Sequence, residues 1–118
     1  MRSIFHYRLT GSLVILLMML GLAGMVSGVY GDELQAGKDL YDAKCMICHG
    51  ANGRGDGPAA AAFTPKPADF TSPSFWKDKT PEKIAKIITT GEGHMPAFNF
   101  KPDEIKAVID YLEQTFKK

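Results

Sequence analysis

Two cysteines and a histidine stand together in the segment KCMICHG, residues 44–50, and the chain has no other cysteine. The spacing Cys-x-x-Cys-His is the attachment motif of a c-type haem. On a helical turn Cys45 and Cys48 project to the same side, so both thiols can add to vinyl groups on one edge of a porphyrin. His49 would then lie beneath the iron. The motif therefore predicts one covalent haem c, anchored by Cys45 and Cys48, with His49 as an axial ligand.

Two other uses of paired cysteines fit the sequence less well. A thioredoxin-like redox pair also has the form C-x-x-C, but it requires a βαβ framework that this sequence does not predict. A zinc site requires four ligands, and after residue 28 the chain offers only Cys45, Cys48, His49 and His94. The adjacent Cys48 and His49 match neither the usual knuckle nor the usual finger spacing.

A haem iron held by one histidine needs a second axial ligand or keeps an open face for a small molecule. After residue 28 the only methionines are Met46 and Met95, and Met46 lies inside the attachment motif, from which it cannot reach the other face. Met95 lies in the loop GEGHMPAF, whose glycines and proline suit a rigid segment that holds a thioether at a metal. The adjacent His94 would instead give bis-histidine iron. The residues by themselves leave both ligands open.

The segments around these residues predict an all-α domain with about three main helices joined by long loops. A first helix begins near Glu33, with Asp32 as its cap, and runs into the cysteine motif. A second begins after the capping residue Thr80 and stops at Gly91. A third opens at Pro102, and no segment alternates for long enough to predict a strand. The apolar face of the third helix consists of Ile105, Val108, Ile109, Leu112 and Phe116.

The segment 50–79 between the first two predicted helices shows no sustained period and is rich in glycine and proline. It nevertheless contains Phe63, Phe70, Phe75 and Trp76, which a solvated linker would not carry. A haem supplies the large apolar surface that these side chains require, so we expect haem binding to be part of folding. The expected wall of the haem pocket is Ile84, Ile87, Ile88, Phe63, Phe70 and Phe98.

The N-terminal segment 1–28 predicts an export signal. Arg2 and Arg8 give a basic start, and an apolar run and a small-residue cleavage site follow. The alternative is an uncleaved membrane anchor, because the uncharged stretch of 23 residues after Arg8 could just cross a bilayer. Residues 29–118 would form the domain that follows.

The charge balance argues against nucleic acid as a partner. The full chain has a net charge of +1, and without the first 28 residues, which hold two arginines, the net charge is about −1. A near-neutral domain has no bulk attraction for a phosphate backbone. A group of lysines near the second predicted helix is either a solvated face or a patch that steers an acidic partner. These lysines are Lys77, Lys79, Lys83 and Lys86.

Three segments resemble a small class I monohaem cytochrome c of the bacterial periplasm. AGKDLYDAKCMICHG is similar to its first helix and attachment site, GEGHMPAF to its axial-methionine loop, and IKAVIDYLEQTF to its final helix. The resemblance covers about residues 32–118 and implies the cytochrome c fold, wrapped round one covalent haem. It implies Cys45 and Cys48 as thioether anchors, His49 as the proximal ligand and Met95 as the distal ligand, with His94 on the solvent or propionate side.

The resemblance also concerns residues outside the ligand set. Trp76 resembles a family tryptophan that donates to a haem propionate, with plain packing as the alternative. Arg54 is a second propionate candidate, with an exposed loop residue as the alternative. In the family the first and last helices cross at a glycine that allows close approach. The matching positions are Gly37, Tyr41, Tyr111 and Leu112.

The function that the resemblance implies is one-electron transport rather than enzymatic catalysis, because iron held on both faces cannot readily bind oxygen or peroxide. We expect a periplasmic carrier that docks weakly with redox proteins, as a monomer or as the cytochrome subunit of a complex such as a dehydrogenase. It would contact a membrane only if the N-terminal segment stays uncleaved. The alternative is a haem enzyme or a gas or redox sensor with a displaceable distal ligand, in which His94 would supply acid–base chemistry.

Overall fold

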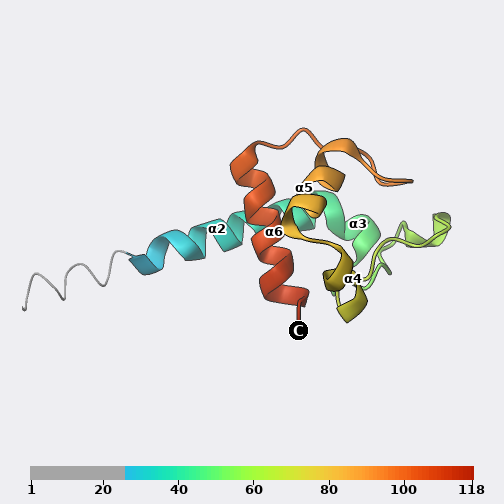
Figure 1. Ribbon diagram of the computed structural model, residues 1–118, viewed down its shortest axis with the longest axis horizontal. Helices are drawn as coiled ribbons and strands as arrows, with labels where there is room; N and C mark the ends of the chain where they lie inside the picture. Colours follow the sequence, from blue (N-terminus) through green and yellow to red (C-terminus); the bar gives the residue numbers. More distant parts are fainter. Residues whose placement is uncertain (1–25) are drawn as a thin grey trace, which may run out of the picture. The chain divides into compact units, whose positions relative to one another are not determined.

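Helices and loops make up the part of the protein that the structure describes. The computed structural model describes residues 26–118, with side chains from residue 31 onward. Within that range one isolated bridge, between Glu92 and Met95, is the only strand-like pairing. In chain order the elements are α2 (Val26–Leu40), η1 (Tyr41–Cys45), α3 (Met46–His49), η2 (Ala60–Ala62), α4 (Pro73–Asp78), α5 (Pro81–Thr90) and α6 (Pro102–Phe116) (Figure 1). The prediction of an all-α domain is confirmed.

The predicted export signal lies almost entirely outside the described residues, so the boundary at residue 28 stays a prediction. Among residues 26–118, no helix combines the length and the apolar character that crossing a bilayer requires. The compact unit that contains the cysteine motif spans residues Glu33–Lys118. The descriptions below refer to this unit.

The first predicted helix is present, but it has an internal irregularity. α2 continues into η1, a single π-helical turn, and then into α3, which ends at His49. The predicted cap is wrong, because α2 begins at Val26 and Asp32 therefore lies inside the helix. A π-helical turn inserts an extra residue and changes the direction of the side chains that follow it, and such turns are frequent at functional sites. Here it ends at Cys45, the first cysteine of the motif, and precedes the α3 turn that carries Cys48 and His49.

α2 and α6 cross in close contact at Gly37. A side chain at this position would collide with the carbonyl oxygen of Ala107, and its Cβ would also lie 3.0 Å from the Cβ of Tyr111. The predicted helix crossing at a glycine is therefore confirmed. The crossing brings Tyr41 and Leu112 into the same buried core, where their side chains are 0% and 3% exposed.

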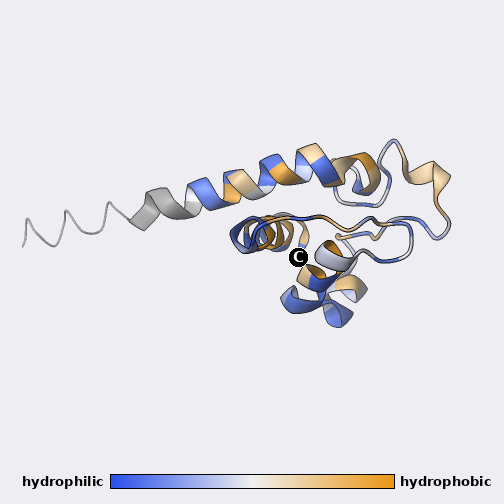
Figure 2. Ribbon diagram, turned by 90° about the horizontal axis from the view of Figure 1, so that it is seen from above, coloured by the Kyte–Doolittle hydropathy of each residue, from blue (hydrophilic) through white to orange (hydrophobic). Residues whose placement is uncertain are grey.

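The starts and stops of the last two main helices follow the predicted signals. The hydroxyl oxygen of Thr80 accepts a hydrogen bond from the Lys83 N–H at 3.4 Å, and α5 ends at Gly91, whose φ is 75°. At the start of α6 the Glu104 carboxylate accepts from the Lys101 N–H at 2.8 Å. Figure 2 shows hydrophilic and hydrophobic residues on both helices, as expected for amphipathic helices. α5 lies beside α6 (Figure 1).

The long segment after α3 is more ordered than its sequence pattern suggested. It contains η2 and α4, both too short for a helical period to be recognised. Its glycine-rich beginning is tied to the end of α3, since the N–H of Gly55 donates to the His49 carbonyl at 2.8 Å and that of Gly57 to the Cys48 carbonyl at 3.1 Å. Residues after the cysteine motif are thereby held close to it.

Candidate cofactor site

An apolar cavity of about 820 Å³ lies beside the aromatic core. Its lining residues come from η1, α3, α4, α5 and α6 and from the loops before and after α4 and after α5. Pockets for cofactors and similar ligands enclose about 300–1,000 Å³ and are mostly apolar. An apolar cavity of this size in so small a domain fits a large flat apolar group such as haem. Ile87, Ile88, Phe63, Phe70 and Phe98 line it as expected, whereas Ile84 is buried in the adjacent core.

Cys45 and Cys48 both line this cavity, are half-buried and form no disulfide. Cys45 closes η1 and Cys48 lies in α3. Burial, and then the neighbouring Cys48, raise the pKa of Cys45 to about 11, so this thiol is protonated at neutral pH. Two thiols at the edge of one apolar cavity suit a two-point covalent attachment of a planar group.

His49 ends α3 and is only 9% exposed. Its Nδ1 lies 3.1 Å from the carbonyl oxygen of Ala68. Because a carbonyl oxygen can only accept, Nδ1 carries the proton and Nε2 keeps its lone pair for a metal. Burial lowers the pKa of His49, against the opposing effect of the Ala68 hydrogen bond. Burial therefore favours the neutral imidazole that metal binding requires, and the Ala68 bond selects the tautomer with Nε2 available.

The face of the His49 ring is covered by Phe70, which the sequence indicated only as part of the pocket wall. The two rings are stacked, with centroids 4.5 Å apart and an angle of 18° between their planes. The N–H of Phe70 donates to the Gly53 carbonyl at 2.7 Å, and the Phe70 carbonyl accepts from Trp76 Nε1 at 2.7 Å. The sequence gives no signal for the contact of Ala68 or the stacking of Phe70, because residues about twenty positions apart form no local pattern.

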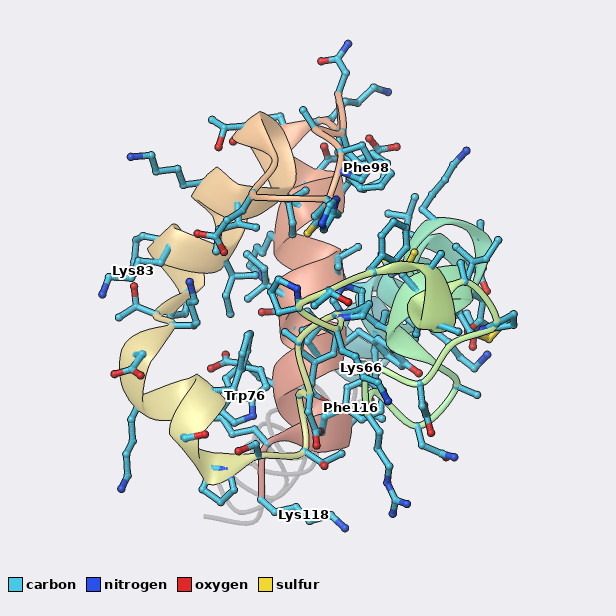
Figure 3. The ribbon with its side chains drawn as sticks, turned by 90° about the vertical axis from the view of Figure 1, so that its right-hand side faces the viewer. Lys66, Trp76, Lys83, Phe98, Phe116 and Lys118 are labelled. Carbon is cyan, nitrogen blue, oxygen red and sulfur yellow. The ribbon has the colours of Figure 1, made fainter. Side chains whose placement is uncertain are left out.

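Trp76 makes the contacts of a packing residue. Its indole N–H donates to Phe70, its ring meets Phe75 edge-on at 5.0 Å, and Lys117 Nζ lies 5.3 Å from its centroid. It is absent from the cavity lining, and Figure 3 shows it beside the C-terminal half of α6, away from Phe98. Of the two roles left open by the sequence, these contacts favour packing, and the propionate role stays a prediction. Arg54 is exposed and also outside the lining.

Met95 lines the same cavity from a tight turn after α5. The N–H of Glu92 donates to the Met95 carbonyl at 3.1 Å, and the N–H of Met95 donates to the Glu92 carbonyl at 2.9 Å. Gly93 occupies the first position of the turn with φ 58°. This two-residue connection presents a half-buried thioether side chain at the cavity, which is compatible with a second axial ligand.

His94, the rival ligand, also lines the cavity but is exposed. Its Nε2 lies 3.3 Å from the Thr64 carbonyl oxygen, and its ring centroid lies 5.4 Å from that of Phe63. These contacts engage one ring nitrogen with the loop before α4. Met95 and His94 both remain at the cavity as possible ligands.

Positive side chains surround the cavity. Lys44, Lys66 and Lys79 are among its lining residues, and Lys79 Nζ lies 3.5 Å from a Glu92 carboxylate oxygen. Within the described part of the chain, no group of three or more His, Cys, Asp and Glu side chains is arranged to hold a metal ion. The zinc alternative therefore finds no ligand cluster among these residues.

Residues 32–112 match the family model described as cytochrome c oxidase, cbb3-type, subunit III. None of the curated proteins matches the chain significantly. A cytochrome c domain carries covalently bound haem c, and Cys45 and Cys48 have the spacing of its attachment motif. The cavity and its cysteines thus fit the group that this family carries.

Proposed function

Because the chain belongs to the cytochrome c family described as cytochrome c oxidase, cbb3-type, subunit III, we propose that it is a periplasmic class I monohaem cytochrome. In this role it carries single electrons between redox proteins. The observation that supports the proposal most directly is that one apolar cavity is lined by both attachment cysteines, by His49 and by Met95.

His49 and Met95 are the proposed axial ligands. His49 would bind through Nε2, because its Nδ1 is engaged by Ala68, and Met95 would bind through its thioether sulfur. Haem, when bound, supplies a ferric/ferrous couple that exchanges one electron. The methionine sulfur and the apolar cavity wall both disfavour the additional positive charge of ferric iron, so these residues raise the reduction potential.

An electron carrier is favoured over an enzyme because two protein side chains would occupy both axial positions. A substrate then finds no coordination position, and the surrounding apolar residues exclude water from the site. The alternative, a haem enzyme or a gas or redox sensor, requires that Met95 does not bind or is easily displaced. His94 is the acid–base group that such an activity would use.

The proposed location is the periplasm, reached by means of the predicted N-terminal signal, with anchoring at the membrane as the alternative if the signal stays uncleaved. Partners would dock weakly and transiently through a small patch. Lysines at the cavity rim and near α5 favour an acidic partner surface, since charge complementarity accelerates encounter. The family description refers to an oxidase subunit. The same carrier could therefore also work as a subunit of a redox complex. The lysines concerned are Lys44, Lys66, Lys77, Lys79, Lys83 and Lys86.

The decisive experiment compares Met95→Ala with His94→Ala in the exported holoprotein. In the wild type we expect haem that is retained in acid–acetone and the weak red absorption band of sulfur-ligated ferric iron. Met95→Ala should abolish this band and lower the reduction potential, and His94→Ala should change neither.

High-spin ferric spectra of the wild type at neutral pH would instead support the enzyme or sensor. A band and a potential that survive Met95→Ala would refute the distal assignment. Loss of low-spin iron in His94→Ala alone would identify bis-histidine ligation. Met46→Leu is the matched control for methionine chemistry, because Met46 packs against the core and should not influence the band.

A further inference from the structure

The hydrogen bond to Ala68 does not by itself fix the His49 ring. It restrains one atom, Nδ1, at 3.1 Å from its acceptor, whereas the torsion between Cβ and an imidazole ring is intrinsically broad. The ring could therefore rotate about its Cβ–Cγ bond and keep a bent hydrogen bond. A contact over the face of the ring is what would prevent this rotation, and the nearly parallel ring of Phe70 makes that contact.

Phe70 is itself held from several directions. Its backbone N–H and carbonyl are both hydrogen-bonded at 2.7 Å, to the Gly53 carbonyl and to the Trp76 indole. Its side chain is 7% exposed. The ring meets those of Phe75, Phe116 and Tyr41 at centroid distances of 5.1, 6.1 and 6.5 Å. A ring clamped in this way can restrain its neighbour, because it cannot easily move aside.

We infer that Phe70 is a positioning residue that sets the plane of the His49 imidazole, with Trp76 as the residue that holds Phe70 in place. Ala68 and Phe70 lie on one short segment, so that segment restrains the imidazole both in its plane and over its face. The inference rests on the proposed function in one respect, namely that His49 binds the iron. It assigns to Trp76 a role in the site although Trp76 does not line the cavity.

The orientation of an axial imidazole is measurable, because it determines how the iron d orbitals split in ferric haem. Electron paramagnetic resonance g values and the hyperfine-shifted NMR signals of a ¹⁵N-labelled histidine report this orientation. Exchange of the Nδ1 proton with solvent reports how often the ring leaves the Ala68 carbonyl. The g values and the hyperfine shifts do not respond to a general loss of stability as long as the protein stays folded. Exchange of the Nδ1 proton also rises with global opening, so it is compared with exchange in a variant of similar stability.

The test compares Phe70→Leu with Phe116→Leu in the holoprotein. Both residues belong to the same core and are 7% and 5% exposed, and both changes remove the same volume, but only Phe70 stacks on His49. An aromatic stack contributes about 0.5–1.5 kcal/mol, so Phe70→Leu should accelerate exchange of the Nδ1 proton about 2- to 12-fold. It should also shift the g values and the His49 signals.

Phe116→Leu should lower the melting temperature to a similar degree and change the His49 signals less, because it removes one of the rings around Phe70 but keeps the ring that stacks on His49. Equal changes in both variants, or none in Phe70→Leu, would overturn the inference. If Phe70→Leu does not retain haem, Trp76→Phe decides, since it keeps the packing and removes the donor to the Phe70 carbonyl. Trp76→Phe should accelerate Nδ1 exchange by a smaller factor than the one expected for Phe70→Leu. An exchange rate equal to that of the wild type would overturn the inference.

Lys117→Gln is the control for Trp76→Phe, because it removes the cation over the indole and preserves the hydrogen bond. It should leave the His49 signals unchanged, and a change equal to that of Trp76→Phe would count against the proposed clamp. Failure of the proposed function has a different signature. A wild type whose His49 shows no hyperfine shift would refute axial binding by His49, whatever the variants do.

Discussion

His49 and Met95 line the same cavity, but the chain holds them in different ways. His49 is 9% exposed, ends a continuous helical segment, and contacts Ala68 through one atom and Phe70 through its ring face. Met95 is half-buried and follows a two-residue turn. Two backbone hydrogen bonds between Met95 and Glu92 close this turn. Its neighbours His94 and Pro96 are exposed.

This difference shows that stability is unevenly distributed around the cavity. Regions with many buried contacts open only with the whole fold, whereas exposed turns with few contacts open locally at low free energy. We therefore expect mutations on the His49 side to change the free energy of global unfolding. Mutations on the Met95 side should instead change the access of small ligands to the iron. A carrier and a sensor would differ mainly in the behaviour of the Met95 turn.

A loss of global stability without a change at the iron is expected for Tyr41→Phe, on the His49 side. The Tyr41 hydroxyl donates to the Gly50 carbonyl at 2.6 Å, and Tyr41 is 0% exposed. Its removal takes away the shorter of two hydrogen bonds to this carbonyl, which also accepts from the Gly53 N–H at 3.1 Å, and should lower the free energy of unfolding by about 0.5–1.5 kcal/mol. Denaturant titration of the holoprotein measures this change, and the red absorption band should be unaffected.

Tyr111→Phe is the matched control, because it removes a hydroxyl from the same aromatic cluster and leaves the bond to Gly50 intact. If Tyr41→Phe loses the red band but keeps its stability, the Tyr41 region affects the iron rather than the stability of the whole fold, contrary to this prediction.

An effect on ligand access is expected for Gly91→Ala, on the Met95 side. Gly91 has φ 75°, and a Cβ there would lie 2.7 Å from the Met95 carbonyl oxygen and 3.1 Å from the Ala97 nitrogen. A backbone with φ 75° and ψ 164° is essentially restricted to glycine and costs about 1–3 kcal/mol for other residues, and the collision should displace the turn. Titration with imidazole should show tighter binding to the ferric iron than in the wild type.

Gly93→Ala separates strain from collision. Gly93 has φ 58°, but a Cβ there would meet nothing within 4 Å, so this variant carries the backbone strain alone. If the affinity for imidazole rises equally in both variants, the collision with the Met95 carbonyl is not what opens the iron to imidazole.

The smallest effect is expected for Lys79→Ala, which removes the ion pair between Lys79 and Glu92 at the Met95 turn. The two side chains are 31% and 62% exposed, so the pair should contribute less than about 1 kcal/mol and lose its effect at high salt. Imidazole titration at low and high ionic strength measures it. Lys77→Ala controls for the loss of one positive charge, and a salt-independent change in Lys79→Ala would indicate a packing role.

Much of the fold was predictable because its signals are local. Thr80 and Gly91 bound α5 as expected, and Pro102 opens α6. Gly37 marks the helix crossing. The start of α2 was misjudged at Asp32, because a good capping residue is also tolerated inside an exposed helix. α4 was missed because a helix of six residues is too short to show a period.

The sequence by itself determined the attachment chemistry, since Cys45, Cys48 and His49 are neighbours in one motif and their spacing suffices to imply a covalent haem. Only the tertiary structure decided which residues hold the His49 imidazole and which group accepts the hydrogen bond of the Trp76 indole. The contacts from Ala68 and Phe70 to His49, and from Trp76 to Phe70, depend on how an aperiodic loop folds back onto α3. Such contacts join residues distant in sequence, and their geometry is set by the packing of the whole loop rather than by any local propensity.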